Sequence, residues 1–223
     1  MPALIFDLDG TLVDTAPDLL SATNAVLVSE GRREVDPATL RHMVGFGARS
    51  LIEQAMAATG EPVAPSRLPE LVERFIVHYR DHIADGSVPF PGVEDTLAAL
   101  QDRGSRLAVL TNKPHELAEK LLGALGLDRY FTVTYGAGRM SYVKPDARIF
   151  HDVVRDLVGL HGGSDKGIMI GDSVTDVATA RAANAPVILV SYGYTPEPAA
   201  KLGADAVTDH FAEIPALAAW LAP

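Results

Sequence analysis

The stretch Phe6-Asp7-Leu8-Asp9-Gly10-Thr11-Leu12-Val13-Asp14 directly continues the apolar run Ala3–Phe6, which is typical of a short buried strand. Ligands of an open α/β sheet bind beyond the carboxyl ends of its strands, where Asp7 and Asp9 are expected. Two carboxylates this close repel each other unless a cation lies between them or one holds a proton. The alternatives are an acidic turn without a site, or an EF-hand loop. The EF-hand fits poorly because Gly10 is in the fourth rather than the sixth position.

Three further polar clusters accompany predicted strands. Thr111-Asn112-Lys113-Pro114 and Gly171-Asp172-Ser173-Val174-Thr175-Asp176 each follow an apolar run, and Val143-Lys144-Pro145-Asp146 precedes a helical pattern. Taken singly, the first is typical of a helix N-cap before proline, Asp172 of a helix cap and Lys144 of a solvated lysine. The coincidence of four such clusters favours one common site instead.

Strand-like runs alternate with helical patterns in the second part of the chain. The runs lie at residues 3–6, 106–110, 167–170 and 186–190, and the helical patterns at 91–100, 114–125, 146–157 and 176–183. This alternation predicts an α/β protein with a parallel sheet. Near the end of the chain, Phe211, Ile214 and Trp220 are expected in a helix that closes the core.

Residues 16–86 have a different pattern. Helical periodicity recurs there, in residues 19–28, 51–58 and 68–83, without a convincing strand, which predicts a helical insert after the first strand. Its borders, residues 14–17 and 85–92, are rich in turn-forming residues. We therefore expect a core made of residues 1–15 and 87–223 and a small helical domain made of residues 16–86.

Composition excludes several classes of function. The 223 residues include 19 basic and 29 acidic side chains, and the net charge of -10 would repel nucleic acid or an anionic membrane surface. Cysteine is absent, which excludes disulfides, thiol catalysis and cysteine metal sites. No apolar run approaches the ~18 residues of a membrane helix, and no basic leader precedes the first strand. We expect a cytoplasmic protein without nucleic-acid or membrane partners.

The residue types in the four clusters suit phosphoryl transfer with magnesium. A phosphate dianion approaches a carboxylate only when a hard cation and a lysine neutralise the charge. An aspartate nucleophile would form an acyl phosphate, while a second carboxyl gives a proton to the leaving alkoxide and later takes one from water. On this interpretation Asp7 and Asp172 hold Mg²⁺, and Asp9 is the acid and base.

The order of the clusters along the chain resembles the haloacid dehalogenase superfamily of phosphohydrolases. Asp7-Leu8-Asp9-Gly10-Thr11 is similar to its first motif and Thr111-Asn112 to its second. Lys144-Pro145 is similar to the third motif, and Gly171-Asp172-Ser173-Val174-Thr175-Asp176 to the fourth.

The resemblance implies a Rossmannoid parallel sheet with helices on both faces, and a cap formed by the helical insert, which closes over the site and selects the substrate. It also implies roles for individual residues. Mg²⁺ would be held by Asp7, the backbone carbonyl of Asp9 and Asp172, with Asp176 as a supporting acid. Catalysis would rest on Asp7, Asp9 and Lys144, and the phosphoryl group would be bound by Thr111, Asn112 and Lys144.

Within the superfamily, the chain is most similar to bacterial phosphoglycolate phosphatases. The similarity lies in residues 13–19, 44–48, 111–114 and 190–194. It implies hydrolysis of 2-phosphoglycolate, a small phosphorylated metabolite, to glycolate and phosphate. Dehalogenases lack an acid at the position of Asp9, and a cap Schiff base would need a lysine, whereas the first lysine is Lys113, beyond the insert.

The insert contains a candidate for substrate selection. Gly45 and Gly47 could form a loop whose backbone approaches a small substrate, and Arg49 could bind its carboxylate in a bidentate pair. The alternative is that the glycines only interrupt a helix and that Arg49 lies in solvent.

Other functions stay open. A related phosphatase or pyrophosphatase with another substrate, or a sugar-phosphate mutase, would use the same core residues. A receiver-like phosphate-sensing module also accepts phosphate on an aspartate, but it needs neither a leaving-group acid nor a cap. We expect a monomer or a homodimer.

Overall fold

A six-stranded parallel sheet forms the centre of the computed structural model, which describes residues 3–161 and 166–222; residues 1–2, 162–165 and 223, which the predicted core includes, lie outside these ranges. The strand order is β5-β4-β1-β6-β7-β8. The strands are β1 (Ala3–Phe6), β4 (Arg106–Pro114), β5 (Val133–Ala137), β6 (Gly167–Gly171), β7 (Val187–Val190) and β8 (Ala206–Thr208). The predicted α/β class with a parallel sheet is confirmed.

Helices cover both faces of this sheet. Successive side chains of a strand point to opposite faces, so each face has its own hydrophobic core. Leu4 and Phe6 of β1 belong to the core beneath α5 (Val93–Asp102), α6 (His115–Ala124) and α9 (Ile214–Leu221). Ala3 and Ile5 belong to a second core beneath α7 (Ala147–His161) and α8 (Val174–Ala182).

Strand β1 is the topological switch point of the sheet. It pairs with β4 on one side and β6 on the other, with Phe6 opposite both Val109 and Ile170. The chain therefore leaves β1 in one direction for β4 and β5, and returns for β6, β7 and β8 on the other side. A crevice forms at the carboxyl ends of strands at such a point, which is where Asp7 begins its loop.

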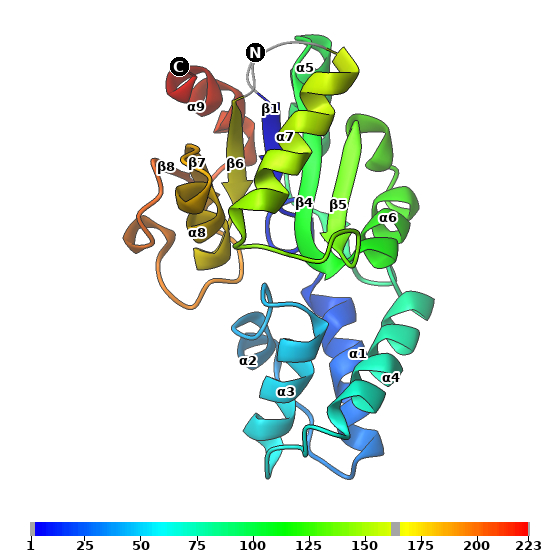
Figure 1. Ribbon diagram of the computed structural model, residues 1–223. Coiled ribbons are helices and arrows are strands. Elements are labelled where there is room, and N and C mark those ends of the chain that lie inside the picture. Colours follow the sequence, from blue (N-terminus) through cyan, green and yellow to red (C-terminus); the bar gives the residue numbers. More distant parts are fainter. Residues whose placement is uncertain (1–2, 162–165, 223) are drawn as a thin grey trace.

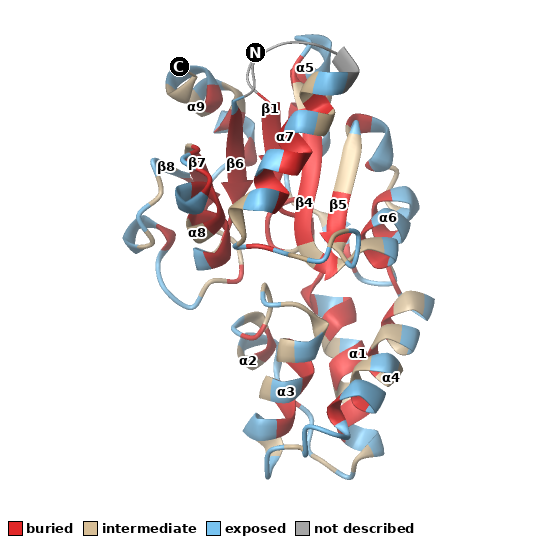
Figure 2. Ribbon diagram, viewed as in Figure 1, coloured by how far each residue is buried: buried red, intermediate tan, exposed pale blue. Residues whose placement is uncertain are grey.

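Residues 16–86, all of them described, contain four helices and no strand. They are α1 (Ala16–Ser29), α2 (Pro37–Arg41), α3 (Ala48–Thr59) and α4 (Leu68–Asp81). Figure 1 shows them beyond the carboxyl ends of the sheet strands, opposite the two termini. Their buried faces turn towards one another, and their outer faces are exposed (Figure 2). The antiparallel pair β2 (Val13–Asp14) and β3 (Val88–Pro89) joins them to the sheet.

Several local expectations differ from the structure. β5 and β8 were not predicted, since β5 is only half apolar and β8 has three residues at the sheet edge. β4 continues through Pro114, so the reading of Thr111 and Asn112 as helix caps is wrong. At the C-terminal end Phe211 and Ile214 are buried, but Trp220 is 71% exposed and does not close the core. Within the described ranges no helix is long and apolar enough to cross a membrane.

Candidate active site

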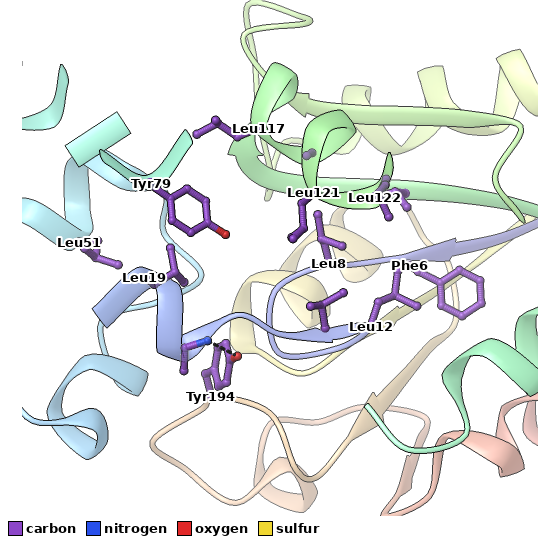
Figure 3. Close-up of a cluster of buried hydrophobic side chains, with 14 of the residues drawn as sticks. Phe6, Leu8, Leu12, Leu19, Leu51, Tyr79, Leu117, Leu121, Leu122 and Tyr194 are labelled. Atoms are coloured by element: carbon purple, nitrogen blue, oxygen red, sulfur yellow. Dashed lines mark hydrogen bonds between the residues drawn. The ribbon is translucent and has the colours of Figure 1, made fainter. Parts of the chain in front are cut away.

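The loop after β1 turns tightly around two buried leucines. The backbone N–H groups of Thr11, Leu12 and Val13 all donate to the carbonyl of Leu8. Leu8 and Leu12 are fully buried in the core and fix the loop to the sheet (Figure 3). Gly10 has a φ of +84°, and a Cβ there would lie 2.6 Å from Asp172 Oδ2. Glycine at this position therefore allows both the turn and the approach of Asp172.

Three buried carboxylates meet at the end of β1. Oxygens of Asp7, Asp172 and Asp176 lie within 4.8 Å of one another. Lys144, which precedes α7, extends its ammonium group between two of them, with Nζ 3.0 Å from Asp7 Oδ1 and 2.7 Å from Asp176 Oδ1. All four side chains are almost completely buried. Residues from three of the predicted clusters therefore lie together at the end of β1, as expected.

The carboxylates differ in how many donors surround them. Asp176 Oδ2 accepts hydrogen bonds from the backbone N–H groups of Asp172 and Ser173 and from the Ser173 hydroxyl. Ser173, not Asp172, is the N-cap of α8, so the reading of Asp172 as a cap is wrong. Asp172 accepts one bond per oxygen, from Thr11 Oγ1 at 3.2 Å and from Tyr194 N at 2.7 Å. Asp176 is therefore the most fully bonded of the three.

Burial and mutual repulsion dominate the electrostatics of this cluster. Burial raises the pKa of Asp7 to about 7, the neighbouring Asp176 and Asp9 raise it too, and Lys144 opposes the rise. Burial likewise raises the pKa of Asp172 well above its usual value, again helped by Asp176. One lysine thus leaves the three carboxylates short of positive charge. A hard divalent cation with oxygen ligands fits this deficit.

Asp9 lies apart from the acid cluster, in contact with a second buried lysine. Lys113 Nζ is 2.8 Å from Asp9 Oδ1 and 2.7 Å from the hydroxyl oxygen of Tyr79, which comes from α4. The side chain of Lys113 is only 2% exposed. The contact of Lys113 with Asp9 was not predicted from the sequence. The one signal was its position beside Thr111 and Asn112.

Thr111 and Asn112 lie next to these groups at the end of β4. Thr111 Oγ1 accepts a hydrogen bond from Lys113 N at 3.1 Å. Asn112 Nδ2 donates to the carbonyl oxygens of Gly45 and Lys144, at 3.3 and 3.2 Å. Asn112 Oδ1 is buried and has no hydrogen-bond partner within the described residues. Asn112 thus connects the sheet, the segment before α7 and the loop that contains Gly45.

A cavity lies between the carboxyl end of the sheet and helices α1, α3 and α4, and its empty space, counted together with the open solvent at its mouth, is about 490 Å³. Its polar lining consists of Asp7, Asp9, Tyr79, Thr111, Asn112 and Lys113. Gly45 and Gly47 also line it, and both have positive φ angles, of +102° and +85°. Arg49 is exposed on α3 and does not line this cavity. The structure therefore brings the two glycines to the site but not Arg49.

Tyr194 and Asp18 make further contacts at the borders of the helical segment 16–86. The Tyr194 hydroxyl accepts hydrogen bonds from the backbone N–H groups of Thr15 and Ala16 at the start of α1 and donates to Asp14 (Figure 3). Asp18 accepts bonds from the backbone N–H groups of Gly86 and Ser87, and so joins the two connections of the insert. Tyr194 thus contacts both Asp172 and the first helix, a role that its sequence context did not predict.

Comparisons with known proteins agree with this geometry. The model of the haloacid dehalogenase-like hydrolase family matches residues 4–190. The phosphoglycolate phosphatase of Caulobacter vibrioides is 45% identical over 95% of this chain and 88% of its own length, and that of Agrobacterium fabrum is 43% identical over 97% and 92%. The crystal structure of a predicted phosphoglycolate phosphatase from Haemophilus somnus superposes with a TM-score of 0.89, at 28% identity and 98% coverage of both chains. Since the family model spans most of the chain and the relatives match nearly all of it, the protein belongs to the haloacid dehalogenase-like hydrolase family.

Proposed function

We propose that the chain is a Mg²⁺-dependent phosphatase that hydrolyses 2-phosphoglycolate through an aspartyl phosphate on Asp7. Its family and its phosphoglycolate phosphatase relatives make it a phosphoric monoester hydrolase. The observation that carries the proposal is the buried cluster of Asp7, Asp172 and Lys144 beside a cavity covered by helices. This arrangement offers a nucleophile and a cation site that open on a cavity.

Asp7, Asp172 and the backbone carbonyl of Asp9 would hold the metal ion. When bound, Mg²⁺ supplies the positive charge that a phosphate dianion needs beside carboxylates. Asp176 would position Lys144 and the Asp172–Ser173 backbone and would not bind the metal ion itself, because its oxygens are already bonded to Lys144, Ser173 and the backbone. The raised pKa values of Asp7 and Asp172 support the choice of these two as metal ligands, because Lys144 alone does not offset their burial and mutual repulsion.

In the first step a carboxylate oxygen of Asp7 attacks phosphorus and the bond from phosphorus to the ester oxygen breaks. Lys144, 3.0 Å from Asp7, holds the nucleophile and binds the phosphoryl oxygens together with Thr111 and Asn112. The two Nδ2 hydrogens of Asn112 are bonded to the carbonyl oxygens of Gly45 and Lys144, so one of these bonds must be exchanged when Asn112 donates to a phosphoryl oxygen. Asp9 gives its proton to the leaving alkoxide, which departs as glycolate.

In the second step Asp9 takes a proton from water, and the water oxygen attacks the phosphorus of the aspartyl phosphate. The bond between phosphorus and Asp7 breaks, which releases inorganic phosphate and restores the carboxylate. Asp9 Oδ1 is bonded to Lys113, whereas no bond to Oδ2 is found among the described residues, so Oδ2 is the oxygen left to give and take the proton in these two steps.

Residues 16–86 form the cap domain in this proposal, and residues 1–15 and 87–223 the catalytic core. Closure would keep water from the aspartyl phosphate until the alcohol has left, and opening would release product. The hydrogen bonds of Asp18 to both connections, and of Tyr194 to the start of α1, are the contacts about which such a movement would pivot.

The test is a steady-state assay with Mg²⁺ on 2-phosphoglycolate, a hexose phosphate, pyrophosphate and p-nitrophenyl phosphate, with Asp7→Asn as the control. We expect the highest kcat/KM for 2-phosphoglycolate, loss of turnover with a chelator, and none in Asp7→Asn. A preference for pyrophosphate, interconversion of hexose phosphates, or stoichiometric labelling without turnover would each reject the proposal in favour of a pyrophosphatase, a mutase or a receiver-like module.

A further inference from the structure

The cavity beside Asp9 contains an unassigned positive charge. Among the described residues that line it, Lys113 is the only one with a cationic side chain. Lys144 is not part of this lining, and its Nζ lies beside Asp7 and Asp176, where the phosphoryl group is bound in the proposed function. A second anionic group on a substrate would therefore meet Lys113 and no other lining cation.

We infer that Lys113, together with the hydroxyl of Tyr79, binds the carboxylate of the substrate and thereby selects short phosphorylated acids. The inference rests on the proposed function, because it needs Asp9 beside the ester oxygen. It assigns the recognition of the acid to a core lysine and a cap tyrosine, in place of Arg49.

Both side chains have a hydrogen to donate. An ammonium group has three N–H donors, and Lys113 uses one on Asp9 and one on Tyr79. The Tyr79 oxygen accepts from Lys113, and no acceptor for its own hydrogen is found in the described part of the chain. Burial raises the pKa of Tyr79 well above its usual value, so the phenol keeps that hydrogen. One N–H and one O–H therefore remain for a carboxylate.

The position of Tyr79 is set by the cap core. Its ring stacks on Phe75 with 5.8 Å between centroids and an interplanar angle of 5°. In Figure 3 it extends from α4 between Leu19 and Leu117, with the hydroxyl turned towards the loop of Leu8. A bond from Tyr79 to the substrate would thus depend on the seating of α4 over the sheet, which couples recognition to the cap.

The short distance between Lys113 and Asp9 explains a preference for small acids. Asp9 must reach the ester oxygen, and Lys113 Nζ is 2.8 Å from Asp9 Oδ1. In 2-phosphoglycolate a single methylene separates the ester oxygen from the carboxylate, so both groups of the substrate can be bound at once. The lining also includes the apolar side chains of Leu19, Leu51 and Phe75, and a carboxylate placed against these by a longer chain would be desolvated without a partner.

The test compares 2-phosphoglycolate with ethyl phosphate, which has the same carbon number but no carboxylate. Wild-type enzyme with Mg²⁺, Lys113→Gln, Tyr79→Phe and Arg49→Ala are assayed on both, and Lys201→Gln, at an exposed lysine of the 3₁₀ turn Ala199–Lys201, is the matched control. We expect Lys113→Gln to lower kcat/KM about 10- to 100-fold more for 2-phosphoglycolate than for ethyl phosphate. Tyr79→Phe should show a smaller selective loss, about fivefold.

The outcomes separate the two proposals. If wild-type enzyme does not prefer 2-phosphoglycolate to ethyl phosphate, the proposed substrate is wrong, and the inference falls with it. If wild-type enzyme has the preference but both variants retain it, or if only Arg49→Ala loses it, the proposed function stands and the assignment of Lys113 and Tyr79 is overturned. Circular dichroism checks the fold, and Tyr79→Phe keeps the test valid if Lys113→Gln does not fold.

Discussion

Replacing Asp7 by asparagine should stabilise the metal-free protein above neutral pH, although it removes the proposed nucleophile. Burial, with help from Asp176 and Asp9, raises the pKa of Asp7 from 3.8 to about 7 despite the opposing Lys144. A carboxyl with a higher pKa in the folded than in the unfolded chain binds protons on folding. Its contribution to stability is complete below pH 3.8 and is lost as the pH rises to about 7. Asparagine has no such proton to lose.

The size of the effect follows from the two pKa values. The difference between 3.8 and about 7 corresponds to about 4 kcal/mol of unfolding free energy at high pH. About 2 to 3 kcal/mol of this should disappear between roughly pH 5 and pH 8. Asp172, whose pKa burial also raises, acts in the same direction in both proteins. Asp7 is one of the charges that raise the pKa of Asp172, so Asp7→Asn also relieves Asp172, and this adds to the difference in the same direction.

Urea denaturation at several pH values with a chelator measures this difference. The unfolding free energy of Asp7→Asn should exceed that of wild type by an amount that grows with pH, and Asp102→Asn, at an exposed residue of α5, is the control. Excess Mg²⁺ should then stabilise wild type more than Asp7→Asn, since one ligand is missing in the variant. Parallel pH curves, or a variant less stable than wild type at about pH 8, would refute the reasoning.

Three further outcomes are expected. Asp9→Asn should slow hydrolysis of 2-phosphoglycolate much more than that of p-nitrophenyl phosphate, whose leaving group needs little proton donation; equal losses in steady-state rates would contradict the acid role. Lys144→Ala should lower kcat by about two to three orders of magnitude, or ~3 to 4 kcal/mol of transition-state stabilisation, and full activity would place this role elsewhere. Gly193→Ala would place a Cβ in the space of the Asp172 side chain, and should raise the Mg²⁺ concentration for half-maximal activity roughly tenfold; an unchanged Mg²⁺ titration would show that Asp172 is not held there for the metal.

The predicted sheet and the core of the site agree with the structure for a common reason. Buried parallel strands are read from short apolar runs, and the polar residues that follow them must lie at one edge of the sheet. Asp7, Lys144 and Asp172 meet there, as their spacing along separate strands and loops indicated. β5 and β8 escaped prediction because a half-apolar strand and a three-residue edge strand carry little periodicity.

The helical segment 16–86 was less completely predicted from the sequence than the sheet. Helical periodicity located α1, α3 and α4, but α2, with five residues, is too short to show a period. Which side chain of this segment lines the cavity depends on how α4 packs over the sheet. This packing brings together residues far apart in the chain, such as Tyr79 and Lys113, and no local sequence pattern predicts such a contact.

The sequence by itself determined the α/β class, the place of the helical insert and the set of acids at the carboxyl ends of the strands, because these depend on local periodicity and on the order of motifs. Only the tertiary structure decided how the charges are paired. It assigned Lys144 to Asp7 and Asp176, Lys113 to Asp9 and Tyr79, and left Arg49 outside the cavity. The physical reason is that pairing and burial in a low-dielectric interior depend on distances of a few ångströms between separate elements, and those distances are set by packing.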